Sequence, residues 1–396
     1  MIAVGEEARR AAIPRASMVH WAAHAISRRR SAVSAPFVVI RSALPGVVWP
    51  AITRPEDATA LALQYQLERS QWLAGDALRE LQFRQLDVLL RHAYETVPFY
   101  RWHWQDVYAA DRALTPESFG RLPLLSQGDL RHEFEALKSG SPSAAHGTVV
   151  ERAGAGATGE PVRTLRTEIT GLWCRALTLR DHLWHRRDFS ATLAAIRTGA
   201  PEEEISGWGP ATGMIADGGR SLTLDIEMAP EAQLEWLQRH EPEYLLTHPA
   251  TASRLARLSL ARGLRLSRLR ELCTAGEPVD AETREVCRKA WDVPLTDVYS
   301  RDETGHIALQ CPDHEHYHVQ SECVLVEVLD GQGRGCAPGG FGRVVITTLH
   351  NYAMPLVRYE TGDFAEVGDP CPCGRGLPVL RRVVGRPRNM RVTAPA

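Results

Sequence analysis

Between residues 230 and 299 the sequence alternates helix-like and strand-like segments, and this alternation restricts the fold more than any other feature of the chain. Helices are expected at 230–240, 249–261 and 280–290, and Pro230 and Pro249 each suit a first helical turn. Short apolar runs at 244–246, 269–273 and 293–299 predict strands between them. Strands that alternate with helices predict an α/β fold, in which helices cover both faces of a parallel sheet.

The sequence before this region is mainly helical in pattern. Residues 60–104 carry apolar residues, Leu81 among them, at helical spacing up to Pro98. Ser126 is expected to cap a short helix within 121–134. A long helix is predicted at 165–189 and a strand at 190–197, whereas residues 197–220 give no clear element.

After residue 320 the pattern changes to antiparallel pairing. Residues 323–349 form two alternating runs joined by a glycine-rich loop, and strand patterns continue at 357–367 and 379–384. We therefore expect an N-terminal extension (1–60), an α/β core with nucleotide-binding loops (61–320), a small antiparallel β subdomain (321–385) and a hinge-like tail (386–396).

Composition excludes several classes of protein. The net charge of −2 gives no overall positive field for nucleic acid, despite an arginine cluster at 28–30. The most apolar early stretch, 37–52, contains Arg41 and two prolines and is shorter than the roughly 20 residues that span a bilayer. The N-terminus lacks a secretory pattern. We expect a cytoplasmic protein whose eight cysteines are reduced or bind a metal.

A glycine-rich stretch, AGAGATGEP (153–161), has the composition of an anion-binding loop. Gly154, Gly156 and Gly159 leave backbone N–H groups free to wrap an anion, and Thr158 adds a hydroxyl donor. The lysine of a Walker loop is missing. The alternative interpretation is an ordinary flexible loop.

Acidic residues follow the predicted strands. TAGEPVD (274–280) and DVYSRDETG (297–305) end neighbouring strands, where ligands collect in open α/β sheets. Asp302 and Glu303 offer carboxylates for Mg²⁺, unless they form only a solvated acidic turn. In NYAMPLVRYETGDFA (351–365), Asp363 can accept hydrogen bonds from two ribose hydroxyls, and Arg358 either fixes the turn or faces the nucleotide.

A separate group of cysteines and histidines has the residue types of a zinc site. Cys311, His318, Cys371 and Cys373 supply three thiolates and one imidazole, which suits a closed, structural Zn²⁺ site. His314 and His316 are competing ligands, and reduced surface cysteines are the alternative. The other cysteines, Cys174 among them, are expected to be core or incidental.

Four motifs together resemble the adenylate-forming superfamily: GAGATGEP (154–161), GEP (276–278), YSRDE (299–303) and HNYAMPLVRYETGD (350–363). The greatest similarity is to the phenylacetate–CoA ligase branch and its capsule-biosynthesis relatives, and RHAYETVPFYR (91–101) also looks like that branch. The resemblance runs from about residue 60 to the last residues. It implies the large N-terminal domain of these enzymes, with sheets covered by helices and a small antiparallel β part.

The resemblance also implies roles by position. ATP phosphates would be cradled by Gly154, Gly156, Thr158 and Gly159. Adenine would be flanked by Gly276, Glu277, Pro278 and Tyr299. Glu303 would hold magnesium with Asp302 beside it, Asp363 would bind the ribose, and Arg386 would lie at the hinge side of the nucleotide. Glu303 and Thr158 are the expected catalytic residues, and His248 is the best candidate for the acid pocket.

The implied reaction joins a carboxylic acid to AMP with release of pyrophosphate, followed by transfer to a thiol such as coenzyme A. Three departures from the family pattern weaken it: alanines at 155 and 157, Ser300 and Asp302 in the acidic motif, and a chain that stops soon after GRPRNM (385–390). The usual C-terminal subdomain and its lysine are therefore expected to be absent. This leaves open a binding protein without turnover, a site completed by another protein, or a different acceptor. A carrier protein and a homodimer are further possible partners.

Overall fold

The computed structural model describes residues 39–154, 162–215 and 218–385. Its helices are α1 (Pro55–Ser70), α2 (Gly75–Thr96), α3 (Pro98–His103), α4 (Pro116–Gly120), α5 (Gln127–His132), η1 (Ala144–His146), α6 (Glu168–Trp184), α7 (Pro230–His240), α8 (Pro249–Arg262) and α9 (Ala281–Trp291). Its strands are β1 (Val150–Gly154), β2 (Val162–Arg166), β3 (Leu193–Arg197), β4 (Glu203–Ser206), β5 (Arg220–Asp225), β6 (Tyr244–Thr247), β7 (Glu271–Ala275), β8 (Leu295–Arg301), β9 (Gly305–Gln310), β10 (Tyr317–Val319), β11 (Val324–Leu329), β12 (Phe341–Thr348), β13 (Tyr359–Val367) and β14 (Val379–Val384).

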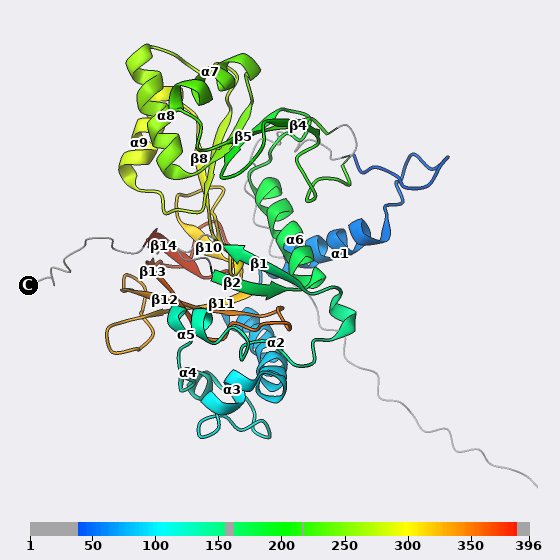
Figure 1. The fold of residues 1–396 in the computed structure, drawn as a ribbon, viewed down its shortest axis with the longest axis vertical. Helices are drawn as coiled ribbons and strands as arrows, with labels where there is room; N and C mark the ends of the chain where they lie inside the picture. The colour runs from blue at the N-terminus through cyan, green and yellow to red at the C-terminus, as the bar shows by residue number, and fades with distance from the viewer. Residues whose placement is uncertain (1–38, 155–161, 216–217, 386–396) are drawn as a thin grey trace, which may run out of the picture. The chain divides into compact units, whose positions relative to one another are not determined.

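Twelve of these strands form one mixed sheet in the order β11-β12-β13-β14-β10-β9-β8-β7-β6-β3-β5-β4. The segment β5-β3-β6-β7-β8 is parallel, and the pairs on either side of it are antiparallel. The remaining strands, β1 and β2, form a separate antiparallel hairpin (Figure 1). The parallel part, the antiparallel part and the α/β class agree with the expectation from sequence.

Helices cover both faces of the parallel strands, as the alternation predicts. On β3, Ala194 and Ile196 are fully buried against apolar residues of α7, α8 and α9, which lie together in Figure 1. Leu193 belongs to a different cluster that includes residues of α1 and α6. Because successive side chains of a strand point to opposite faces, Leu193 and Ala194 pack against helices on opposite faces of the sheet.

Two details of the sequence-based assignment are wrong. Leu81 of α2 is 49% exposed. The face of α2 that meets β11 instead uses Gln82, whose side chain donates to the carbonyls of Ser321 and Val324. Strand β7 begins at Glu271, two residues later than predicted. Leu269 is buried, but it packs into the α7–α9 cluster from the loop before the strand.

The local signals at the helix ends hold. Ser126 caps α5 in a capping box with Asp129, as predicted. The apolar run at 190–197 contains β3, and the runs at 323–349 form the antiparallel pair β11–β12. Strand β5 and the β1–β2 hairpin were not predicted. The division at residues 60, 320 and 385 stays a prediction.

No helix within the described residues combines the length and the apolar character that a membrane span needs.

Candidate active site

The end of β8 carries a buried cluster of ionised side chains. Arg301 donates from Nε to Glu303 Oε1 at 2.7 Å and from Nη1 to Asp363 Oδ2 at 2.8 Å. The Tyr299 hydroxyl donates to the same Asp363 oxygen at 2.9 Å, and the Tyr359 hydroxyl donates to Glu303 Oε1 at 3.0 Å. Arg301 therefore joins two carboxylates that were predicted to serve a single nucleotide.

Burial makes this cluster electrostatically strong. Glu303 is 8% exposed and Asp363 is 5% exposed, so both charges are largely removed from water. Burial opposes the charge of Arg301, but the two carboxylates raise its pKa above the ordinary value. Burial and the Asp363 charge raise the pKa of Tyr299 well above its ordinary value, which keeps its hydroxyl a donor at neutral pH. Two acids and one base leave the cluster a formal charge of −1.

The predicted phosphate loop connects β1 to β2 and starts beside this cluster. Gly154, the last residue of β1, lies so close to Asp302 that an added Cβ would be 2.5 Å from the Asp302 Cβ. A side chain at position 154 would therefore push the hairpin away from the acidic motif. Gly156, Thr158 and Gly159 lie outside the described residues, and so does Arg386.

The GEP turn follows β7, the parallel neighbour of β8. Gly276 has a φ of +90°, which favours glycine. A Cβ added to Gly276 would lie 3.6 Å from the nearest atoms of the His248 ring. Glu277 Oε2 accepts from the backbone N–H of Ala250 in the first turn of α8. Pro278 lies against Gly385, since a Cβ there would be 2.9 Å from the Pro278 ring. The turn thus lies between α8 and the end of the described chain.

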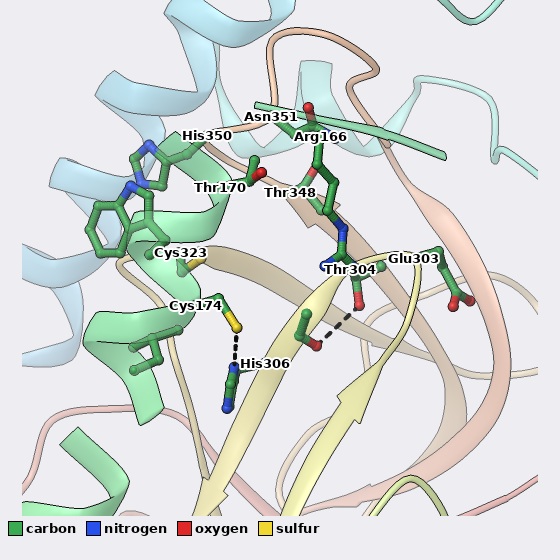
Figure 2. Close-up of a pocket in the computed structure, with 13 residues that line it drawn as sticks. Arg166, Thr170, Cys174, Glu303, Thr304, His306, Cys323, Thr348, His350 and Asn351 are labelled. Carbon is green, nitrogen blue, oxygen red and sulfur yellow. Dashed lines mark hydrogen bonds between the residues drawn. The ribbon is translucent and has the colours of Figure 1, made fainter. Parts of the chain in front are cut away.

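A cavity of about 40 Å³ opens beside Glu303, and we call it the Glu303 cavity. Its lining comes from α6, the start of β9 and the loop after β12, and comprises Arg166, Thr170, Trp173, Cys174, Leu177, Glu303, Thr304, Gly305, His306, Cys323, Thr348, His350 and Asn351. Figure 2 shows the Arg166 side chain extending toward Thr304 between Thr348 and Glu303. Within the described part of the chain, the Arg166 side chain has no hydrogen bond or ion pair. His248 is not among the lining residues.

The Arg358 side chain holds its turn in place, and none of its described hydrogen bonds reaches Arg301, Glu303 or Asp363. Its φ is +49°, and its guanidinium donates to the carbonyls of Gly120 and Leu122 and to both carboxylate oxygens of Glu327. The side chain is 6% exposed. Burial raises the pKa of Glu327, and the charge of Arg358 opposes that shift. The first of the two roles predicted for Arg358 is therefore the one that its contacts support.

Replacing Arg358 with methionine should destabilise the fold by about 3 kcal/mol, because Glu327 and two carbonyls would stay buried without their donor. Urea unfolding measures the loss. The matched control is Arg343→Met, which breaks a half-exposed pair with Glu360 and should cost no more than about 1 kcal/mol. Equal losses in the two variants would show that the Arg358 contacts are not the cause.

The predicted zinc ligands converge. The candidate ligand atoms of Cys311, His318, Cys371 and Cys373 all lie within 4.8 Å of one another. The pairing of β10 with β9 and β14 brings their loops together. Cys311 Sγ and Cys371 Sγ are 3.8 Å apart, and Cys373 Sγ and His318 Nε2 are 3.5 Å apart. His316 remains a competitor, with Nε2 at 3.0 Å from Cys371 Sγ.

Burial lowers the pKa of His318 to about 4, so its imidazole is neutral at pH 7, the form that binds metals. Zn–S bonds of about 2.3 Å at tetrahedral angles place two sulfur atoms about 3.8 Å apart. The observed separation of the Cys311 and Cys371 sulfurs therefore fits a zinc ion.

Sequence reasoning missed three features of the site. Arg301 stands inside the quoted acidic motif, but β8 has an irregular register between Tyr299 and Ser300 and ends before Glu303, so strand alternation alone does not predict that these side chains meet. Arg166 lines the Glu303 cavity and was not among the predicted site residues. Cys174 was expected to be incidental but lines the Glu303 cavity with His306, a contact between α6 and β9 that no local pattern contains.

Comparisons with known proteins agree with this architecture. No protein-family model matches the chain. In sequence, the chain is 27% identical to a phenylacetate–coenzyme A ligase of Thermus thermophilus, over 83% of this chain and 75% of that protein. It is 24% identical to the Pseudomonas putida enzyme of the same name, over 80% of this chain and 72% of that protein.

In structure, the chain is similar to an open conformation of 2-hydroxyisobutyryl-CoA ligase, crystallised with 2-HIB-AMP and CoA. The TM-score is 0.66 at 18% identity, with 82% of this chain and 79% of that chain covered. The same ligase in its thioesterification state gives a TM-score of 0.64 at 19% identity, over 81% of this chain and 70% of that chain. At this level of identity the similarity establishes the fold.

Proposed function

Since this chain resembles the phenylacetate–coenzyme A ligases of the adenylate-forming superfamily and has the fold of an acyl-CoA ligase, we propose that it activates a carboxylic acid with ATP. The acid oxygen attacks the α-phosphorus, which gives an acyl-adenylate and pyrophosphate. A thiol, with coenzyme A as the first candidate, then takes the acyl group and releases AMP. Positioning and neutralisation of charge carry phosphoryl chemistry of this kind.

One observation carries the proposal: Arg301 holds Glu303 and Asp363 together at the end of β8, where Gly154 meets Asp302. Arg301 and Asp363 are 62 residues apart in the sequence, so the fold alone brings them together. A buried pair of acids with a glycine-rich loop beside it offers donors for phosphate and acceptors for a sugar and a cation in one place.

Each acidic residue has a proposed task. Asp363 accepts hydrogen bonds from the two ribose hydroxyls, and Tyr299, which donates to Asp363, keeps the carboxylate oriented toward them. Glu303, held by Arg301 and Tyr359, is the carboxylate that would bind Mg²⁺, with Asp302 next to it. When bound, Mg²⁺ neutralises phosphate charge. The remaining predicted phosphate-loop residues, Thr158 included, keep their proposed role in binding ATP.

Arg301 must change partners when the nucleotide binds. In the structure it neutralises both carboxylates that the ribose and the metal would use. Once these ligands share the carboxylates, the guanidinium is released beside the triphosphate, where a positive charge is useful. We propose that Arg301 supplies part of the charge that the family lysine provides in related enzymes.

The Glu303 cavity is the proposed place of the acid. A volume of about 40 Å³ has room for one or two water molecules, so an acid as large as phenylacetate requires lining side chains to move. Trp173 is stacked on His350 at a centroid distance of 4.3 Å, and we propose that these two aromatic rings are the side chains that move. His248 was predicted to line the acid pocket, but it does not line the Glu303 cavity. Because it lies against Gly276, we propose it instead as a contact on the adenine side of the site.

A second candidate function is nucleotide binding without turnover. It is favoured by Arg301, which already satisfies both carboxylates, and by the alanines at positions 155 and 157 of the phosphate loop. Pyrophosphate release from ATP, measured with a panel that includes phenylacetate and 2-hydroxyisobutyrate, separates the two. Release with at least one acid supports the ligase; binding of ATP without release for every acid contradicts it.

The Cys311–His318–Cys371–Cys373 group is proposed to hold one structural Zn²⁺, as a site distinct from the nucleotide site. Purified protein should contain about one zinc per chain by elemental analysis, and Cys371→Ser should lose it together with thermal stability. The control is Cys336→Ser, a loop cysteine outside the group. Protein that refolds with unchanged stability in a zinc chelator would contradict a structural zinc.

The finer assignments on partners and compartment are proposals as well. All eight cysteines are free thiols in the structure, which fits the reduced cytoplasm where ATP and coenzyme A are found. A carrier protein as acyl acceptor, a protein that completes the site and a homodimer stay predictions.

A further inference from the structure

Cys174 lies inside the Glu303 cavity at the start of a chain of polar groups. The thiol comes from the middle of α6, and His306 comes from β9 on the facing side. Cys174 Sγ is 3.8 Å from His306 Nδ1 (Figure 2). His306 Nε2 is 3.5 Å from Oγ1 of Thr178, which lies one helical turn after Cys174. The Cys174 thiol, the His306 ring and the Thr178 hydroxyl thus form one row, and the Cys174 end of this row lies in the cavity.

The direction of the hydrogen bonds in this row follows from Thr178. Its hydroxyl donates to the backbone carbonyl of Cys174 at 2.9 Å, so the oxygen is left to accept from His306 Nε2. A proton on Nε2 makes Nδ1 the acceptor of the neutral ring. The thiol is then the donor to Nδ1, which is the arrangement of a nucleophile with its general base and an orienting third group.

The charge around the thiol favours its ionised form. Burial works against the thiolate, but the hydrogen bond to His306, the positive charge that His306 carries once it has taken the thiol proton, and the Arg166 guanidinium together hold the pKa of Cys174 below its ordinary value. Cys323 lines the same cavity without such help, and burial raises its pKa to about 12. The two cavity cysteines therefore differ in reactivity, and only Cys174 has a base beside it among the described contacts.

We propose that Cys174 accepts the acyl group from the acyl-adenylate before it passes to the external thiol, an inference that rests on the proposed adenylation. The thiol proton moves to His306 Nδ1 as a carbon–sulfur bond forms at the acyl carbon. The bond from that carbon to the phosphate oxygen breaks, and AMP leaves with the electron pair. The external thiol then loses its proton to solvent and attacks the cysteine thioester. The bond from the acyl carbon to Cys174 Sγ breaks, and the departing Cys174 thiolate takes back the proton held on His306 Nδ1.

The first experiment measures thiol reactivity and does not depend on adenylation. Limiting iodoacetamide, with peptide mass spectrometry, should modify Cys174 at least about tenfold faster than Cys323. His306→Ala and Thr178→Val should each slow Cys174 alkylation, and Thr178→Ser, which keeps the hydroxyl, should restore it. Equal rates for Cys174 and Cys323 in the wild-type protein would overturn the proposal.

The second experiment looks for the acyl group itself. Wild-type protein is incubated with ATP, Mg²⁺ and an acid that supports pyrophosphate release, then quenched in acid and digested. The expected result is the acyl mass on the Cys174 peptide, removable by hydroxylamine and absent from Cys174→Ser. Pyrophosphate release without any acyl mass on Cys174 would overturn this inference and leave the proposed function intact. No pyrophosphate with any acid would overturn both, and the pyrophosphate assay distinguishes the two failures.

Discussion

Replacing Glu303 with glutamine should lower the rate of ATP–pyrophosphate exchange by about 10²–10³-fold. Glutamine keeps the shape of the side chain and can still accept from Arg301 and Tyr359, so the fold should hold. It removes the negative charge that the proposed Mg²⁺ needs beside the phosphates. The loss should therefore fall on catalysis and not on stability, and exchange assays with thermal unfolding on the same samples measure both.

Glu360→Gln is the matched control for this variant. Glu360 lies on β13 between Tyr359 and Thr361, and its carboxylate pairs with Arg343 on the neighbouring strand β12. The substitution makes the same chemical change on an element that also carries Asp363, and exchange should stay within about twofold of wild type. If both variants lose the same fraction of exchange activity, the loss in Glu303→Gln comes from removing a carboxylate in this region and not from removing a metal ligand.

Replacing Asp363 with asparagine should weaken ATP binding by about 10–100-fold, because hydrogen bonds to a charged group contribute about 1.5–3 kcal/mol each and asparagine accepts only through a neutral oxygen. Arg301 retains Glu303 as an ion-pair partner in this variant, so its charge is not left unpaired. Calorimetric titration with ATP and Mg²⁺ measures the change. ATP affinity equal to that of wild type would remove Asp363 from the nucleotide site.

Much of the fold follows from local patterns. The alternation at 230–299 sufficed for the parallel strands β6, β7 and β8, because strands buried on both faces are short apolar runs between helices. The hairpin β1–β2 was missed because β1 is exposed at four of its five residues, and because the end of β2 falls within the helix predicted at 165–189. The buried face of α2 is apolar (Leu78, Leu86, Leu89, Leu90 and Ala93), and Leu81 lies outside it although its spacing fits the same helical pattern.

The candidate site was predicted as motifs, and the structure adds their connections. Gly154, which begins one quoted motif, lies beside the acidic motif, and Glu303 and Asp363, which end two others, meet at Arg301; the resemblance is what allowed these motifs to be grouped. Arg301 was printed within one of these stretches but its partners lie on β13, out of reach of local reasoning. The row of Cys174 and His306 joins α6 to β9, so only the three-dimensional packing contains it.

The central claim, that Asp363 binds the ribose of ATP, is tested most directly by comparing ATP with 2′,3′-dideoxy-ATP on the wild type and on Asp363→Asn. We expect the dideoxy compound to bind the wild type at least as weakly as ATP binds the variant, and the variant to discriminate between the two nucleotides much less than the wild type does, because both changes act on the same contact. Equal affinity of the wild-type protein for both nucleotides, with ATP binding intact, would contradict the account.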